Sequence, residues 1–189
     1  AGGSEAHCRA LAERLAARHD VTVLTTCARA YLTWRNAYPA GWGEAGGVRV
    51  GRFPVAHPRN LHRFADITEL AFDSRASADE ERQWFEENGP DSPELLRYLE
   101  AHGADYDLVL FWSYRYAHAF FGLPLVADRA ILAPTAEEDP VIRFTTLGRF
   151  FTLPRGYLFL TPEEAELVGS RIDGSLPPSR IVGSGVEPA

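Results

Sequence analysis

The sequence predicts an α/β domain of the Rossmann-like kind, with three layers and a mostly parallel sheet. Strand-like and helix-like segments alternate along almost the whole chain, as in βαβ units. The length of 189 residues suits one domain with a sizeable core, residues 1–189. The composition, with 46% hydrophobic and 24% charged residues, is that of an ordinary folded protein and excludes extensive disorder.

The first third of the chain is predicted to contain one helix and then strands. Cys8, Leu11 and Leu15 fall on one stripe of a helix that we place at residues 4–18. The further predictions here are a strand over 21–25, a glycine-rich loop over 41–47 and a half-exposed strand over 48–53.

Residues 57–91 give the least clear pattern. The segment 75–88 is polar and acidic, which indicates a solvated helix or an insertion, with Trp84 and Phe85 anchoring one side. A helix is then predicted after Ser92, an N-cap followed by proline at the first helical position. Apolar runs predict buried strands over 108–112, 130–133 and 157–160, and a last short strand is predicted over 180–182.

The clearest local signal is Thr161-Pro162-Glu163-Glu164. It predicts a helix start with Thr161 as N-cap and proline at the first position. Glu164 is expected to reach back to the N-cap and close a capping box. The helix should run to about Ile172.

Charge and cysteine content exclude several classes of protein. A net charge of −7 without a recognisable basic face opposes nucleic-acid binding. Cys8 and Cys27 form no C-x-x-C pair, which favours two buried thiols and a cytoplasmic protein. The six histidines lack metal-ligand spacing, and no apolar run is long enough to span a bilayer, so we expect neither a metal nor a transmembrane helix.

A stretch of basic and apolar residues over 143–155 raises the question of membrane contact. Arg143, Arg149 and Arg155 alternate with phenylalanine and leucine, and such a pattern can touch a membrane surface. An amphipathic helix packed on the sheet explains the same pattern, and we favour that interpretation.

Gly2-Gly3-Ser4-Glu5 stands immediately before the first helix. Glycines there allow an anion to approach the backbone, and the free N–H groups of a helix N-terminus favour negative charge. A diphosphate is the natural ligand, and His7, one turn into the helix, could face the same cleft. The alternative is a plain glycine turn with Ser4 as N-cap.

Two further polar segments follow predicted strands, at the carboxyl edge where open α/β sheets bind ligands. In the segment 134–140, Glu137, Glu138 and Asp139 stand between two prolines and could accept hydrogen bonds from sugar hydroxyls. A solvated acidic loop explains them equally well. Ser113-Tyr114-Arg115 follows the strand at 108–112 and could line a polar pocket; packed aromatics at a helix start are the alternative.

In their order along the chain, these pieces resemble retaining glycosyltransferases of family 4, which have the GT-B fold of two facing Rossmann-like domains. The matching pieces are Gly2-Gly3-Ser4-Glu5, Asp107-Leu108-Val109-Leu110 with its aromatic loop, Thr161-Pro162-Glu163-Glu164, and Gly183-Ser184-Gly185-Val186 at the domain exit. The resemblance implies the N-terminal, acceptor-binding half of such an enzyme. The first strand of the family's sheet and the C-terminal donor-binding domain would lie outside these residues.

The resemblance also implies an activity and its residues. A sugar would pass from a nucleotide-diphosphate sugar to an acceptor with retention of configuration, usually without a metal or other cofactor. Gly2 and Gly3, with Ser4 and His7, would face the donor diphosphate. Glu137, Glu138 and Asp139 would be catalytic, while Ser113, Tyr114 and Arg115 would bind the acceptor. Partners would be the two substrates and the chain's own C-terminal domain.

One departure from the family keeps a rival open. The loop 134–140 is similar to a family segment written P-T-A-H-D-E-P, whose histidine helps hold the transferred sugar, and Glu137 takes that position here. This favours the alternative of a non-catalytic Rossmann-like binding or interaction domain. A nicotinamide oxidoreductase is more distant, because the sequence lacks G-x-G-x-x-G spacing.

Overall fold

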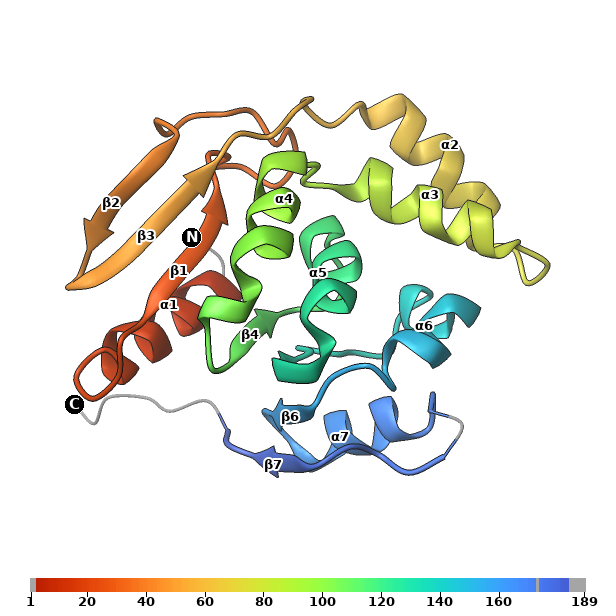
Figure 1. Ribbon diagram of the computed structural model, residues 1–189. Helices are drawn as coiled ribbons and strands as arrows, with labels where there is room; N and C mark the ends of the chain where they lie inside the picture. Colours follow the sequence, from red (N-terminus) through yellow and green to blue (C-terminus); the bar gives the residue numbers. More distant parts are fainter. Residues whose placement is uncertain (1–2, 173, 184–189) are drawn as a thin grey trace.

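The computed structural model describes residues 3–172 and 174–183, and it has an α/β fold built on two sheets (Figure 1). The first sheet has the order β1-β3-β2, with β1 parallel to β3 and β2 antiparallel to it. Its strands are β1 (Thr22–Thr26), β2 (Gly41–Ala45) and β3 (Val48–Phe53).

The second sheet has the order β4-β5-β6-β7, and all its strands are parallel. The strands are β4 (Val109–Trp112), β5 (Ala130–Ala133), β6 (Gly156–Phe159) and β7 (Ser179–Ile181). Each strand is followed or preceded by helix, so the sheet is flanked by helices. The predicted α/β class of the Rossmann-like, three-layer kind is thereby confirmed.

The helices occupy the connections between the strands (Figure 1). The α-helices are α1 (Gly3–Leu15), α2 (Leu61–Ala71), α3 (Ala78–Asn88), α4 (Pro93–His102), α5 (Ala117–Gly122), α6 (Thr145–Phe150) and α7 (Pro162–Gly169). The short 3₁₀ helices are η1 (Gly103–Asp105), η2 (Leu123–Arg129) and η3 (Val141–Arg143). Both α1 and α7 end about three residues before their predicted ends.

The prediction of a loop over 41–47 is wrong for residues 41–45, which form β2. The glycines that suggested a loop serve a hairpin: Gly46 and Gly47 have φ of 59° and 76°, the region that a tight turn between antiparallel strands requires. Gly51 on β3 leaves room for the Trp42 ring, because a Cβ there would lie 2.8 Å from that ring.

The unclear stretch 57–91 contains two packed helices, α2 and α3. Asn60 caps α2, accepting from the backbone N–H groups of His62 and Arg63. Ser77 and Glu80 form a reciprocal capping box at the start of α3, a signal that sequence analysis missed. Trp84 and Phe85 are buried, which confirms that they anchor this segment.

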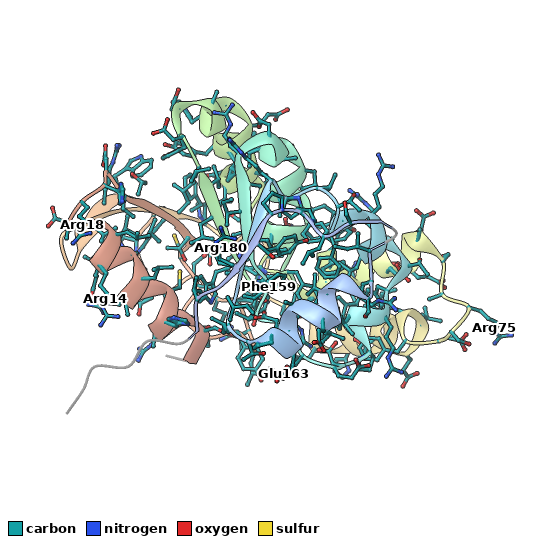
Figure 2. All side chains as sticks on the ribbon, turned by 90° about the horizontal axis from the view of Figure 1, so that it is seen from below. Arg14, Arg18, Arg75, Phe159, Glu163 and Arg180 are labelled. Carbon is teal, nitrogen blue, oxygen red and sulfur yellow. The ribbon has the colours of Figure 1, made fainter. Side chains whose placement is uncertain are left out.

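The main core lies between the second sheet and helices α3, α5 and α6. The rings of Phe85 and Phe120 stack with centroids 3.9 Å apart, and Tyr157 stacks on Phe159 at 5.0 Å. Figure 2 shows Phe159 among the packed side chains of the interior, whereas Arg14 projects from α1 and Arg18 from the turn that follows it. Burying each such ring contributes about 1.5–3 kcal/mol.

The apolar side chains of the basic stretch over 143–155 belong to this core. Phe144, Leu147 and Phe150 are buried beneath α6, as an amphipathic helix packed on the sheet requires. The interpretation that we favoured over membrane contact at these residues is therefore confirmed. In the part of the chain that the structure describes, no helix is both long and apolar enough to cross a membrane.

The strand β4 differs from the fully buried central strand that its apolar sequence predicts. Leu108 and Leu110 are exposed, although Phe111 is buried. The physical reason is that side chains alternate between the two faces of a strand, so Leu110 lies on the face opposite to Phe111, and this face is open to solvent there. Among the described residues, β4 pairs only with β5 and β1 only with β3, so each of these two strands has one edge without a ladder partner.

Candidate functional site

Three residues with strained backbone follow strands at the carboxyl edge of the two sheets. Trp34, Ser113 and Thr135 have φ of 49°, 64° and 49°, although none is glycine. They come after β1, β4 and β5 respectively. Left-handed conformations of such residues cost free energy and concentrate at functional sites. The strained residues thus lie in loops at the carboxyl ends of the strands, the edge at which the sequence predicts ligand binding.

The loop 113–116 turns two of its three predicted acceptor-binding residues inward. Ser113 is buried, and its hydroxyl accepts a hydrogen bond from the backbone N–H of Arg115 at 3.3 Å. Tyr114 is fully buried against Phe151, with ring centroids 5.4 Å apart. Only Arg115, whose side chain is 33% exposed, can reach a substrate at this edge.

The hydroxyl of Tyr114 is an unusual interior group. It is inaccessible to solvent and has no hydrogen-bond partner among the described residues. Burial, and to a lesser degree the negative charge of Asp139, raises the pKa of Tyr114 well above its usual value, so this hydroxyl stays protonated. Tyr114 therefore supports the loop from below and is not a proton donor or acceptor at ordinary pH.

Arg115 gathers the acids of the loop 134–140. Its Nη1 lies 2.6 Å from Asp139 Oδ2, a close ion pair without hydrogen-bond alignment, and 3.2 Å from Glu137 Oε1. Asp139 is only 16% exposed and also accepts from the backbone N–H of Ile142 at 3.0 Å, whereas Glu137 is 73% exposed. Of the two acids on Arg115, Glu137 is the one open to a ligand.

Glu138 points to a different partner. Its carboxylate accepts two hydrogen bonds from the guanidinium of Arg143, at 2.6 and 3.0 Å. All three predicted catalytic acids are therefore paired with arginines. No group of histidine, cysteine or acidic side chains within residues 3–172 and 174–183 is placed to hold a metal ion.

A buried glutamate holds this acidic loop in place. Glu164 accepts hydrogen bonds from the backbone N–H groups of Ala136 at 2.8 Å and Leu160 at 2.6 Å. Thr161 caps α7 as predicted, because its hydroxyl accepts from the N–H of Glu164 at 3.1 Å. The prediction that the Glu164 carboxylate returns to the backbone N–H of Thr161 is wrong, because it accepts from Leu160 and Ala136 instead. Only one of the two hydrogen bonds of a capping box is therefore formed.

The N-terminus of α1 lies beside the loop 113–116. The helix begins at Gly3, so Gly3 and Ser4 stand exposed in its first turn; Gly2 falls outside the described residues. His7, one turn into α1, meets Trp112, the last residue of β4, with ring centroids 5.0 Å apart. Burial raises the pKa of Tyr116, and the negative charge of Glu5 raises it further. The first-turn N–H groups of α1 are thus brought to the same edge as the two loops.

His7 packs on the sheet. Its ring meets Trp112 edge to face, with centroids 5.0 Å apart. The two rings border an open, mostly apolar depression whose other lining residues include Leu11, Ala133, Leu158 and Val182. A second depression, beside the acidic loop, is lined by Ala136, Glu137, Glu138, Thr161, Glu163, Glu164 and Leu167.

An aromatic and amide network, which sequence analysis missed, connects the loops after both sheets. Trp34 Nε1 donates to the Asn88 carbonyl at 2.6 Å, and Asn88 Nδ2 donates to the Arg115 carbonyl at 2.7 Å. The Trp34 ring meets Tyr116 edge to face at 5.7 Å. These residues are scattered over more than 80 positions and match no local motif, so only the folded chain reveals them.

His118 stands behind this network, stacked on Tyr116 with ring centroids 5.9 Å apart. Its Nδ1 is buried and has no hydrogen-bond partner among the described residues. Burial lowers the pKa of His118 to about 4. The ring is therefore neutral at physiological pH.

Comparison with known proteins identifies no relative. No protein-family model matches the chain, and no curated protein or solved structure is significantly similar to it.

Proposed function

We propose that the chain is the acceptor-binding domain of a retaining glycosyltransferase that uses a nucleotide-diphosphate sugar. The observation that carries the proposal is the convergence of α1's first turn with the loops 113–116 and 134–140 at one sheet edge. The contact of His7 with Trp112, and the depression that both share with Ala133, bring the start of α1 to the ends of β4 and β5, where a partly exposed arginine and an exposed carboxylate follow. This is the set of groups that a sugar diphosphate requires.

In the proposed reaction the bond between the anomeric carbon and the diphosphate breaks, the acceptor oxygen bonds to that carbon on the same face, and the proton of the acceptor hydroxyl passes to the departing diphosphate. The N–H groups of the first turn of α1, with the helix dipole, stabilise the departing diphosphate. Glu137 accepts hydrogen bonds from sugar hydroxyls, while Arg115 fixes its position. Asp139 and Glu164 hold the loop in shape.

Binding of nucleoside diphosphates tests the diphosphate role. Uridine, guanosine and adenosine diphosphates are titrated by calorimetry into the chain and into Gly3→Val. A Cβ at Gly3 meets no atom within 4 Å, so valine there alters the approach of an anion without a packing clash. We expect at least about tenfold weaker binding.

Gly169→Val is the matched control, because Gly169 also lies in a helix and its Cβ would also meet nothing within 4 Å. It should bind like the unaltered chain. Equal binding by both valine variants would refute the diphosphate site at α1.

A non-catalytic binding domain is the second candidate, and one observation favours it. The three acids in the loop 134–140 are paired with two arginines, Arg115 and Arg143, which suits recognition as well as catalysis. Release of free nucleotide from a nucleotide sugar distinguishes the two. Binding of the nucleotide sugar without turnover, even when a donor-binding domain is supplied, would support the second candidate.

A further inference from the structure

The loops that follow β1 and β3 form one ordered surface. The Asn36 amide donates to the Val55 carbonyl and accepts from the Val55 N–H, both at 2.9 Å, and the Arg59 N–H donates to the Thr33 carbonyl at 2.9 Å. The loops 27–40 and 54–60 therefore lie side by side (Figure 1). We name their outer side the β1/β3 loop surface, made of Arg29, Tyr31, Leu32, Arg35 and Leu61.

The part of the chain that carries this surface is rich in basic residues, although the chain as a whole is acidic. Residues 27–63 hold six of the 19 basic residues but only one of the 26 acidic residues, while the whole chain has a net charge of −7. Arg29 and Arg35 are exposed, and neither has a carboxylate partner among the described residues. A segregated patch of unpaired arginines attracts phosphate groups.

The same surface exposes apolar side chains. Tyr31, Leu32 and Leu61 are 58%, 53% and 55% exposed. The turn that carries Tyr31 and Leu32 is fixed to the rest of the protein through Trp34, so these side chains cannot turn inward. Trp34 is held by its hydrogen bond to Asn88, and the guanidinium of Arg59 lies 5.1 Å from the centroid of the Trp34 ring. Aliphatic and aromatic side chains held in water beside arginines are typical of surfaces that enter the headgroup region of a membrane.

We propose that the β1/β3 loop surface binds bilayers that contain anionic lipid. Arg29 and Arg35 contact lipid phosphates, and Tyr31, Leu32 and Leu61 enter the boundary between headgroups and acyl chains. A nucleic acid also offers phosphates, but it provides no apolar phase for Leu32 and Leu61. The proposal does not depend on glycosyl transfer.

Vesicle sedimentation with the whole chain tests this surface. Vesicles of phosphatidylcholine alone are compared with equal mixtures of phosphatidylcholine and phosphatidylglycerol. The chain should sediment with the mixed vesicles and only weakly with the neutral ones. Raising the salt concentration should reduce the binding, since exposed charges are screened. Absence of sedimentation with the anionic vesicles would overturn the proposal.

Two double variants separate the charged from the apolar contribution. Arg29→Ala/Arg35→Ala should weaken binding roughly 25-fold, about fivefold for each arginine. Leu32→Ser/Leu61→Ser should weaken it at least about tenfold. The changed residues are exposed, so far-UV circular dichroism should show unaltered folds.

The control is Arg75→Ala/Arg97→Ala, which removes two exposed arginines elsewhere; Figure 2 shows Arg75 at the tip of the turn between α2 and α3. This variant should bind vesicles like the unaltered chain. If the control loses as much binding as Arg29→Ala/Arg35→Ala, general charge is responsible and the proposal fails. It fails as well if Leu32→Ser/Leu61→Ser binds normally and a DNA duplex competes with the vesicles.

Discussion

The loops at the carboxyl ends of the two sheets differ in what holds them. After the first sheet, the loops 27–40 and 54–60 are tied together by an exposed asparagine, and they present arginines and apolar side chains to solvent. After the second sheet, the loops 113–116 and 134–140 are fixed from beneath by the buried Glu164 and by Asp139, and they present carboxylates.

The difference shows how the loops of two sheets in one domain can suit different tasks. A loop fixed by buried charges keeps its polar groups in one geometry, which chemistry on a small substrate requires. A loop with exposed apolar groups instead suits a broad surface, where exact placement matters less. If this comparison holds, substitutions beneath the second-sheet loops should cost much more stability than those that join the first-sheet loops.

The largest effect is expected from Glu164→Ala. The change leaves the N–H groups of Ala136 and Leu160 without their acceptor inside the protein. We expect a loss of about 3 kcal/mol in the free energy of unfolding, measured by urea denaturation. Glu163→Ala is the control: Glu163 is exposed at the start of α7, so about 0.5 kcal/mol or less should be lost. Equal losses for the two variants would show that Glu164 does not fix the second-sheet loops.

His118 should give the next largest effect, as a dependence of stability on pH. Its folded pKa of about 4 lies below the ordinary value of 6.5, so the unfolded chain binds the proton more readily. The stabilising contribution of the neutral ring is complete above pH 6.5 and is lost as pH falls through 4. Between those values stability should fall by about 3 kcal/mol.

The measurement is urea denaturation of the unaltered chain and His118→Phe at several pH values. The variant should lack this part of the pH dependence. His19→Gln, which changes an exposed histidine, should keep it. A variant curve parallel to that of the unaltered chain would show that His118 is not the responsible group.

On the first sheet, Asn36→Ala should cost about 1 kcal/mol, because it removes two hydrogen bonds to Val55 at an exposed site. Asn36→Asp keeps the acceptor for the Val55 N–H but loses the donor. Its unfolding free energy should therefore fall between those of the unaltered chain and Asn36→Ala. Urea denaturation decides the order. A loss as large as that of Glu164→Ala would mean that both sets of loops are equally anchored.

The smallest effect is expected from Tyr114→Phe. The hydroxyl is buried without a partner among the described residues, so its removal should change stability by no more than about 0.5 kcal/mol, or even raise it. Thermal unfolding of the two proteins side by side is sufficient. A clear destabilisation would reveal a bound water or ligand at that oxygen.

The sequence predicts the second half of the fold better than the first. The runs at 130–133 and 157–160 and the Thr161 N-cap are local signals, and the strands and the cap form where they indicate. The strand β2 was missed because Gly41, Gly43 and the turn glycines Gly46 and Gly47 suggested a loop, whereas its pairing with β3 is a contact between two segments. The alternation of apolar residues within one segment carries no information about the strand with which that segment pairs.

The site was predictable in position but not in detail. Strand ends locate the loops 113–116 and 134–140, since parallel strands meet ligands at their carboxyl edge. The inward turn of Tyr114 depends on a left-handed Ser113, and the loop 134–140 depends on Glu164. The network of Trp34, Asn88 and Tyr116 requires long-range packing that no spacing in the sequence encodes.

The unpaired edges of β1 and β4 have a consequence for how the molecule opens. Amides on those edges lack a ladder partner within the described chain, so they should exchange with deuterium sooner than the amides that bond β3 and β5. The helix α4 spans the junction, where the Tyr98 ring lies 5.3 Å from Phe53 and its hydroxyl 3.0 Å from that of Tyr106. We therefore expect the two sheets to open as separate cooperative units in hydrogen exchange.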